Sequence, residues 1–553
     1  MVEDPLIAVM EEVLPEWVGY KIPRSKGTRV KFLQGTHTSV EEHNFAYIQG
    51  DLVSSQANTS TGFNLTAVVG DRSHNFVKHM HLSSVPSNPL SFRRYLLESL
   101  NDFLKDAAVE FLEEGKDDPK EYRDVGGLSE EDGDIIELAD FSELPPIDLS
   151  RLQAVVEQGV KSLFENRRYR FILEPIASVS YERAKRRIFT TENVAFSRVD
   201  ELGGLSLYGK VLNQKNREAR VQVNRIFPNL ESLLQAGIFE QAMGDLKRDS
   251  GQFRNTKPIR SGRYFIIMYP QAAATWYHEV LMAHIVSGEY NVDDFVGALR
   301  GNFGEIMMST DISIHVDPLA QGGFNYTRDD EGVLGQKVTI IHEGRLVNFL
   351  LGRESALQMK QWVEEQEQYE DDFAERIYRI MQADGGFVSN GHARVEFNKA
   401  APEPRLSNMI VESSNRAGIK QIHQEARDRA LDAGHKYYLI AEGGGSAGEV
   451  ETEEGEARVY TRKIWAVNVH SGEKFLLENP KIIDSTDHAR GKDRIVLSST
   501  KNYWDLGLCG ADSGWVTIGH NVPITLLANT TVHCEPDKKK ATPPLKYPIG
   551  LSL

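Results

Sequence analysis

Two histidines and a glutamate, His278, Glu279 and His284, lie in one short stretch that reads HEVLMAH. A His-Glu pair followed by a second histidine on a helix is typical of zinc hydrolases, where imidazoles bind the metal and the carboxylate takes a proton from water. The usual spacing of four residues places the two rings about 40° apart around a helix. Here the histidines are six residues apart, which corresponds to about 240° on a regular helix. They can therefore share a metal only if the helix ends, kinks or widens into a π-type turn between them.

The chain has two cysteines, Cys509 and Cys534. Two cysteines in 553 residues form no disulfide framework and favour a reducing cytoplasm. Each cysteine is a buried core residue, a metal ligand or a nucleophile, and their positions alone leave these alternatives open.

Three further stretches have unusual composition: DDEG at 329–332, PEPRLSN at 402–408 and GGG at 443–445. The prolines of the second favour extended backbone, and the glycines of the third let a backbone approach a ligand closely. The triple glycine follows an expected strand but opens no helix, which argues against a nucleotide-binding loop. Taken singly, each stretch is interpreted as a turn.

The elements that must position these residues follow from hydrophobic periodicity. Before residue 256, alternation predicts strands at 29–33 and 64–69 and several strands over 171–223, and helical spacing predicts helices at 95–113, 152–164 and 230–246. After it, a strand at 263–268 precedes a helix at 271–286 with Pro270 in its first turn, a position that proline favours. Further strands are predicted at 337–341, 345–351, 437–440, 463–469 and 495–499, with one long helix at 363–381. The predicted class is α+β, with a domain at 1–257, an acidic insert near 115–146, and a strand-richer domain at 258–553.

Composition excludes several classes of protein. Hydrophobic residues make up 40 % and charged residues 26 %, as in globular proteins. The net charge is −17, which argues against nucleic-acid binding. No stretch approaches the roughly 18–20 uncharged apolar residues of a membrane helix, and the acidic N-terminus does not look like a secretory signal. These features predict a cytoplasmic protein.

Together the motifs resemble the TldD/PmbA family, the "modulator of DNA gyrase" peptidases, and they occur in the family's order. The similar segments are the metal helix at 278–284 with Gly288-Glu289 after it, the D-D-E-G segment, the P-x-P-R-x-[ST]-N segment, the glycine-rich turn, and a late C-G-x-D segment at 509–512. The resemblance covers roughly residues 170–530 well.

The resemblance implies a zinc-dependent peptidase with an N-terminal α/β domain and a β-rich C-terminal domain that carries the metal helix. By position it assigns His278, His284 and Cys509 as zinc ligands and Glu279 as general base. Three protein ligands leave a fourth position for water. It also implies an extended peptide substrate in a groove formed by Gly443, Gly444, Gly445, Arg405 and Asn408, and a homodimer or a heterodimer with a family paralogue.

One departure from the family pattern leaves an alternative open. The family helix has its histidines five apart, a spacing that already requires a widened turn, and this chain has one residue more, Met282 or Ala283. Either that residue is looped out or the ligand set has changed. If the chain binds zinc, the backbone must bulge or break at 281–283, and deleting Met282 keeps or improves metal binding. The alternative is a metal-free, non-catalytic member that binds peptides or completes an oligomer.

Overall fold

The structure is a computed structural model of the 553-residue chain. It describes residues 4–534, except 24–27, 49–50, 72–74, 115–134, 140, 142–143, 145–146, 166–171, 193, 213–217, 283–302, 368–371, 384–385, 397, 400, 445–448, 452–455, 460 and 486–490.

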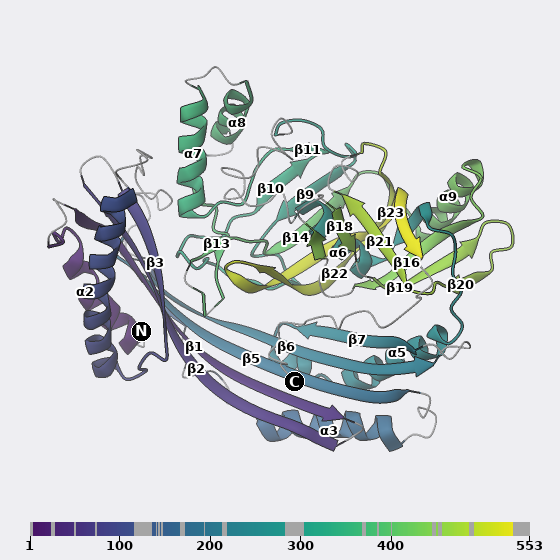
Figure 1. Cartoon of the computed structure of the whole chain (residues 1–553), viewed down its shortest axis with the longest axis horizontal. Coiled ribbons are helices and arrows are strands. Elements are labelled where there is room, and N and C mark those ends of the chain that lie inside the picture. Colours follow the sequence, from purple (N-terminus) through teal and green to yellow (C-terminus); the bar gives the residue numbers. More distant parts are fainter. Residues whose placement is uncertain are drawn as a thin grey trace.

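The first half of the described chain forms a long, curved, seven-stranded sheet (Figure 1). Its strands run in the order β3-β2-β1-β5-β6-β4, with β7 also paired to β6. Their bounds are β1 Arg29–Ile48, β2 Asp51–Gly70, β3 Asn75–Ser83, β4 Ile135–Glu137, β5 Leu173–Thr190, β6 Val194–Leu212 and β7 Glu218–Phe227.

Helices cover one face of this sheet in two clusters. At one end α1 Pro5–Val13, the 3-10 turn Pro15–Trp17 and α2 Pro89–Glu114 pack on β1–β3. At the other end α3 Leu149–Glu165, α4 Leu230–Leu233 and α5 Ile238–Phe253 pack on β5–β7. Side chains alternate between the faces of a strand, so Val179 and Tyr181 of β5 pack beneath these helices. Arg186, on the opposite face of β5, contacts the second half of the chain.

The described residues of the second half form a fourteen-stranded sheet whose longest path is β11-β10-β9-β14-β23-β8-β16-β19-β20. The bounds are β8 Gly262–Met268, β9 Ile312–Val316, β10 Val338–His342, β11 Arg345–Leu346, β14 Asn408–Ser413, β15 Arg416–Ala417, β16 Tyr437–Gly444, β17 Glu449–Glu451, β18 Glu456–Val459, β19 Thr461–Asn468, β20 Lys474–Leu476, β21 Pro480–Ser485, β22 Ile495–Ala511 and β23 Gly514–Cys534. A separate pair joins β12 Ala393–Arg394 to β13 Glu403–Pro404.

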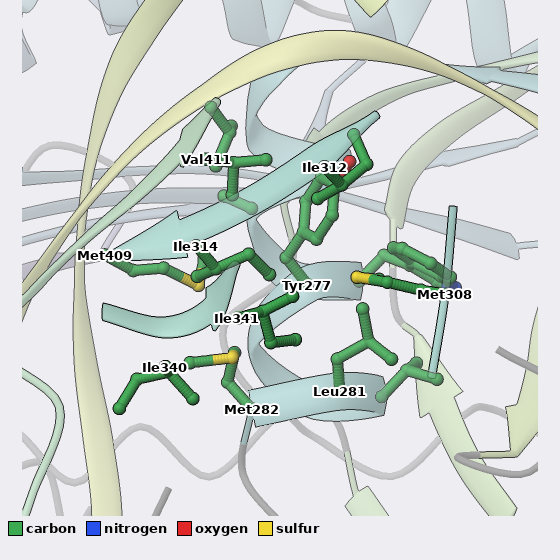
Figure 2. Close-up of a cluster of buried hydrophobic side chains, with 14 of the residues drawn as sticks. Tyr277, Leu281, Met282, Met308, Ile312, Ile314, Ile340, Ile341, Met409 and Val411 are labelled. Carbon is green, nitrogen blue, oxygen red and sulfur yellow. The ribbon is translucent and has the colours of Figure 1, made fainter. Parts of the chain in front are cut away.

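Among the described residues, four helices and one π-helical turn accompany the second sheet: α6 Pro270–Trp276, the π turn Tyr277–Met282, α7 Arg353–Glu367, α8 Asp372–Ala383 and α9 Ile419–Asp432. α6 and the π turn lie in the largest hydrophobic cluster, where Tyr277, Leu281 and Met282 are almost fully buried. Figure 2 shows these three side chains among those of the neighbouring strands. The turn that carries His278 is therefore anchored in the core rather than on the surface.

The α+β class is confirmed, with the strand-rich half C-terminal. All described strands of the first sheet end before residue 228 and those of the second begin at 262; the domain boundary at 257 itself stays a prediction. Two expected elements differ. The single helix predicted at 363–381 is replaced in the structure by two helices: α7 ends at Glu367 and α8 begins at Asp372. Within the predicted acidic insert, β4 pairs in parallel with β6, while most of that insert lies outside the described residues. Among the helices of the described chain, none has the length and apolar character needed to cross a membrane.

Candidate functional site

His278 lies in the π-helical turn that directly follows α6. Pro270 begins α6, and the next turns are held by buried aromatic side chains: the indole of Trp276 donates to Asp484 at 2.9 Å, and the Tyr277 hydroxyl lies 3.3 Å from that of Thr525. The six-residue spacing of His278 and His284 requires an irregular helix between them if they are to share a metal, and this π turn is such an irregularity. Turns of this kind occur frequently at functional sites. His284, the second predicted ligand, lies outside the described residues.

Cys509 lies on β22, which pairs with β23 in a long antiparallel hairpin that places Cys509 opposite Val516. This hairpin brings the half-buried thiol beside the buried imidazole of His278. Two of the three residues assigned as ligands by the family resemblance are thus together in space. Cys534, at the end of β23, is buried in the core, and burial raises the pKa of its thiol.

The electrostatics of Cys509 favour its thiolate. Burial alone raises the thiol pKa, but the guanidinium of Arg405 and the imidazole of His278 outweigh it, so the pKa of Cys509 is lowered to about 6. The pKa of His278 shifts in the opposite sense: burial lowers it, whereas the charges of Cys509 and Glu279 raise it above its usual value. Thiolates are the form of cysteine that binds metals and attacks electrophiles. The half-buried Glu279 follows His278 on the same turn.

Arg405 is almost fully buried and fixed by the tip of the hairpin. Its guanidinium donates to the Ser513 hydroxyl at 2.6 Å and to the carbonyl oxygens of Gly514 and Cys509. The P-x-P-R segment therefore supplies the cation that stabilises the thiolate, a role that the linear sequence did not indicate.

His520 is a member of this site that sequence reasoning missed. It lies on β23 opposite Asp505 and is almost fully buried. Its Nε2 atom lies 3.1 Å from Nδ1 of His278, and the two rings are nearly perpendicular at 86°. No local pattern singles out His520, since an isolated histidine in a strand has no characteristic spacing.

The remaining predicted substrate-binding residues have structural contacts of their own. The buried amide of Asn408 donates to the carbonyl oxygens of Asp317 and Phe324 and accepts from the Phe324 amide. Gly443 has a positive φ of 74°, and a Cβ there would lie 2.6 Å from Arg462. Gly444 ends β16, and Gly445 lies outside the described residues. Their roles in substrate binding stay predictions.

The D-D-E-G segment joins the two sheets. Asp329 accepts the backbone amides of Glu331, Val333 and Ala393. Asp330 accepts from Arg198 of β6 at 2.7 Å and from the Val395 amide at 2.8 Å. This segment therefore acts in the structure as a buried polar junction.

The donors near Cys509 fit zinc in chemistry, because a thiolate and a neutral imidazole are its preferred ligands. Within the described part of the chain, no three His, Cys, Asp or Glu side chains are grouped so that they could hold a metal ion. His278 and Cys509 thus form two parts of a candidate centre, and the third assigned ligand, His284, is among the residues left undescribed.

Comparisons with known proteins agree with this fold. Residues 261–468 match the PmbA/TldA metallopeptidase C-terminal domain. A metalloprotease of Methanocaldococcus jannaschii is 32 % identical over 108 residues, which are 19 % of this chain and 23 % of that protein. One of Methanothermobacter thermautotrophicus is 29 % identical over 102 residues, 18 % of this chain and 22 % of that protein. The aligned part thus spans less than a quarter of either relative.

Two solved structures share the fold over almost the whole chain. A Thermotoga maritima protein described as a modulator of DNA gyrase superposes with a TM-score of 0.61 at 15 % identity, covering 96 % of this chain and 98 % of that one. TldE of Thermococcus kodakarensis superposes with a TM-score of 0.59 at 13 % identity, covering 95 % and 99 %. The match of residues 261–468 to the PmbA/TldA metallopeptidase C-terminal domain and the shared fold agree with the resemblance of the ordered motifs to the TldD/PmbA family.

Proposed function

We propose that this chain is a zinc-dependent peptidase that cleaves extended peptides. The observation that carries the proposal is the pairing of Cys509 with His278, two residues from distant segments, beside Glu279 and the buried guanidinium of Arg405. A thiol whose pKa is lowered to about 6 is largely ionised at neutral pH, as zinc binding requires.

His278, His284 and Cys509 would hold the zinc. When bound, the ion supplies a Lewis acid that polarises the peptide carbonyl and lowers the pKa of water. The carboxylate of Glu279 accepts the proton of the attacking water and delivers it to the nitrogen of the departing amine. Arg405 keeps Cys509 ionised and fixes the hairpin tip through its bonds to Ser513 and Gly514.

The substrate proposed here is an extended peptide whose backbone pairs with a strand of the second sheet, the usual means of binding unfolded segments. Gly443, Gly444 and Gly445 are proposed to line that groove. Because the side chains of Arg405 and Asn408 already bond to backbone groups, we assign them to the wall that shapes the groove.

We also propose that the chain acts as a dimer, either with itself or with a family paralogue, on the strength of the family resemblance. Light scattering coupled to size-exclusion chromatography measures this directly. A mass near 62.2 kDa, with no paralogue copurifying, would contradict the proposed dimer.

The zinc content of protein purified without chelator tests the catalytic proposal. We expect about one zinc per chain, with hydrolysis of unfolded peptides that a chelator abolishes. The two cysteines provide a matched pair: Cys509→Ser should lose most of the zinc, whereas Cys534→Ser should keep it, because Cys534 packs in the core. Zinc retained in full by Cys509→Ser would refute this ligand assignment.

The metal-free alternative rests on a specific observation, the six-residue spacing between His278 and His284. A chain that loses its metal but keeps the fold would serve as a peptide-binding or partner subunit. Wild-type protein without zinc, even after incubation with the ion, would favour this alternative over the peptidase.

A further inference from the structure

His520 makes an edge-on contact with the candidate metal ligand His278. Its Nε2 atom lies 3.1 Å from His278 Nδ1, with ring centroids 5.2 Å apart. Both rings are almost fully buried, at 6 % and 5 % exposure. A nitrogen–nitrogen distance of this size in a buried pair is a hydrogen bond, so one of the two nitrogens carries the shared proton.

The register of the hairpin explains why His520 and Cys509 approach His278 together. In an antiparallel pair, opposite residues share a face and alternate residues return to it. Cys509 lies opposite Val516, and His520 is four residues further along β23, so Cys509 and His520 are on the same face. Gly507, which pairs with Ile518 between them, has no side chain there; a Cβ would lie 3.4 Å from the His520 ring.

The position of the shared proton decides what His278 can bind. A neutral imidazole carries one proton, and the nitrogen without it is the metal donor. If Nδ1 of His278 carries the proton and donates to His520, then Nε2 keeps its lone pair for a metal. Ligating histidines usually donate their second N–H to a fixed acceptor, which sets both tautomer and ring orientation.

We propose that His520 is a positioning residue that accepts the Nδ1–H hydrogen bond of His278 and thereby holds Nε2 of His278 ready to bind zinc. This inference rests on the proposed function, because it assigns His278 as a ligand. It explains why the buried His278 of the π turn has its Nδ1 atom next to the imidazole of His520 instead of a carboxylate.

Zinc affinity, measured by competition with a chelator, tests the proposal without any activity assay. His520→Leu should weaken zinc binding about 10- to 100-fold, the usual cost of removing such a partner. His520→Gln, whose amide oxygen can accept the same bond, should recover most of the affinity. His315→Leu is the control, since the His315 ring on β9 contacts Thr339 of β10 and Glu412 of β14. Affinity of His520→Leu within twofold of wild type would overturn the proposal.

A second measurement separates this proposal from the zinc proposal. In deuterated protein with ¹⁵N-labelled histidine, the one-bond coupling shows which nitrogen of the His278–His520 pair carries the shared proton, with or without zinc. We expect it on His278 Nδ1. A proton on His520 Nε2 would overturn the positioning role even if zinc binds. A proton on His278 Nδ1 in a protein that binds no zinc would refute the zinc-dependent function, while the hydrogen bond from His278 to His520 would stand.

Discussion

At the scale of single residues, the candidate site combines groups whose charges stabilise one another. The thiol of Cys509 is ionised more easily because Arg405 and His278 are close, and His278 is protonated more easily because Cys509 and Glu279 are close. Binding a metal at this pair would replace the imidazolium proton, so zinc binding should release protons and weaken as the pH falls towards 6.

Glu279→Gln should keep the zinc and abolish peptide hydrolysis. The amide cannot accept the proton of the attacking water, while His278, His284 and Cys509 are unchanged. A loss of at least 100-fold in kcat with one zinc per chain is expected, since general-base catalysis contributes about 10²–10⁴-fold. Unchanged turnover at full zinc occupancy would remove Glu279 from the mechanism.

His37, on β1, should make the protein less stable in acid. Burial and the charge of Arg187 lower its pKa from 6.5 to about 4, and in the described structure neither ring nitrogen has a hydrogen-bond partner. Between pH 6.5 and 4 the unfolded chain therefore takes up a proton that the folded chain refuses, so the free energy of unfolding falls as the pH falls. The loss is on the order of 3 kcal/mol, at 1.36 kcal/mol per pKa unit.

Urea denaturation at pH 7 and pH 4.5 measures this effect. His37→Leu should lose less stability between the two pH values than wild type, because Phe92 and the surrounding core accept an apolar side chain. His470→Leu, at an exposed position, should behave like wild type. Equal acid sensitivity in His37→Leu and wild type would show that His37 is not responsible.

At the scale of elements, the π turn and the β22–β23 hairpin together form the site. The turn is held by Leu281 and Met282, which pack among the strands of the second sheet (Figure 2). The hairpin contributes Cys509 on one strand and His520 on the other. The site therefore depends on both elements.

Deleting Met282 would restore the five-residue histidine spacing of the family, but the structure indicates that it should also lower the stability of the protein. Met282 is fully buried, and losing a buried methionine side chain costs about 2–5 kcal/mol. Met282→Ala is the matched variant, since it removes the side chain without changing the spacing. If the deletion is as stable as wild type and binds zinc more tightly, the extra residue is a looped-out insertion after all.

At the scale of the whole molecule, the first sheet lies beside the second half of the chain (Figure 1). Charged side chains on the open face of this sheet connect it to that half. Arg198 of β6 donates to Asp330 and to the Arg328 carbonyl, and it also pairs with Asp200 on its own strand. Gln34 of β1 donates to the Asp330 carbonyl at 2.6 Å. Two of these partner atoms belong to Asp330 and one to the preceding Arg328, so this junction depends on Asp330 of the D-D-E-G motif.

Arg198→Met should cost about 3–5 kcal/mol, because it leaves the carboxylate of Asp330 buried without its closest cation. Asp330 is only 2 % exposed. Glu137→Gln breaks a partly exposed bond to Arg328 and should cost about 1 kcal/mol or less. Equal effects of the two variants in chemical denaturation would mean that the junction contributes little to stability.

The part of the structure that the sequence alone predicts depends on how far apart in the chain the interacting residues lie. Alternation and helical spacing predicted β8 within a residue, and β16 and β19 within a few residues, because these patterns are local consequences of one buried face. They could not predict that β1, β2, β5 and β6 each run for about twenty residues, since pairing across the sheet extends strands whose own pattern is weak.

The sequence by itself determined the resemblance to the TldD/PmbA family, the α+β class and the candidate ligands His278 and Cys509, because these depend on residue types in a fixed order. Only the tertiary structure decided that Arg405 lowers the pKa of Cys509, that the turn at His278 is π-helical, and that His520 contacts His278. These contacts join residues more than a hundred positions apart. They depend on strand register, which a one-residue shift would reverse, and no short stretch of sequence encodes it.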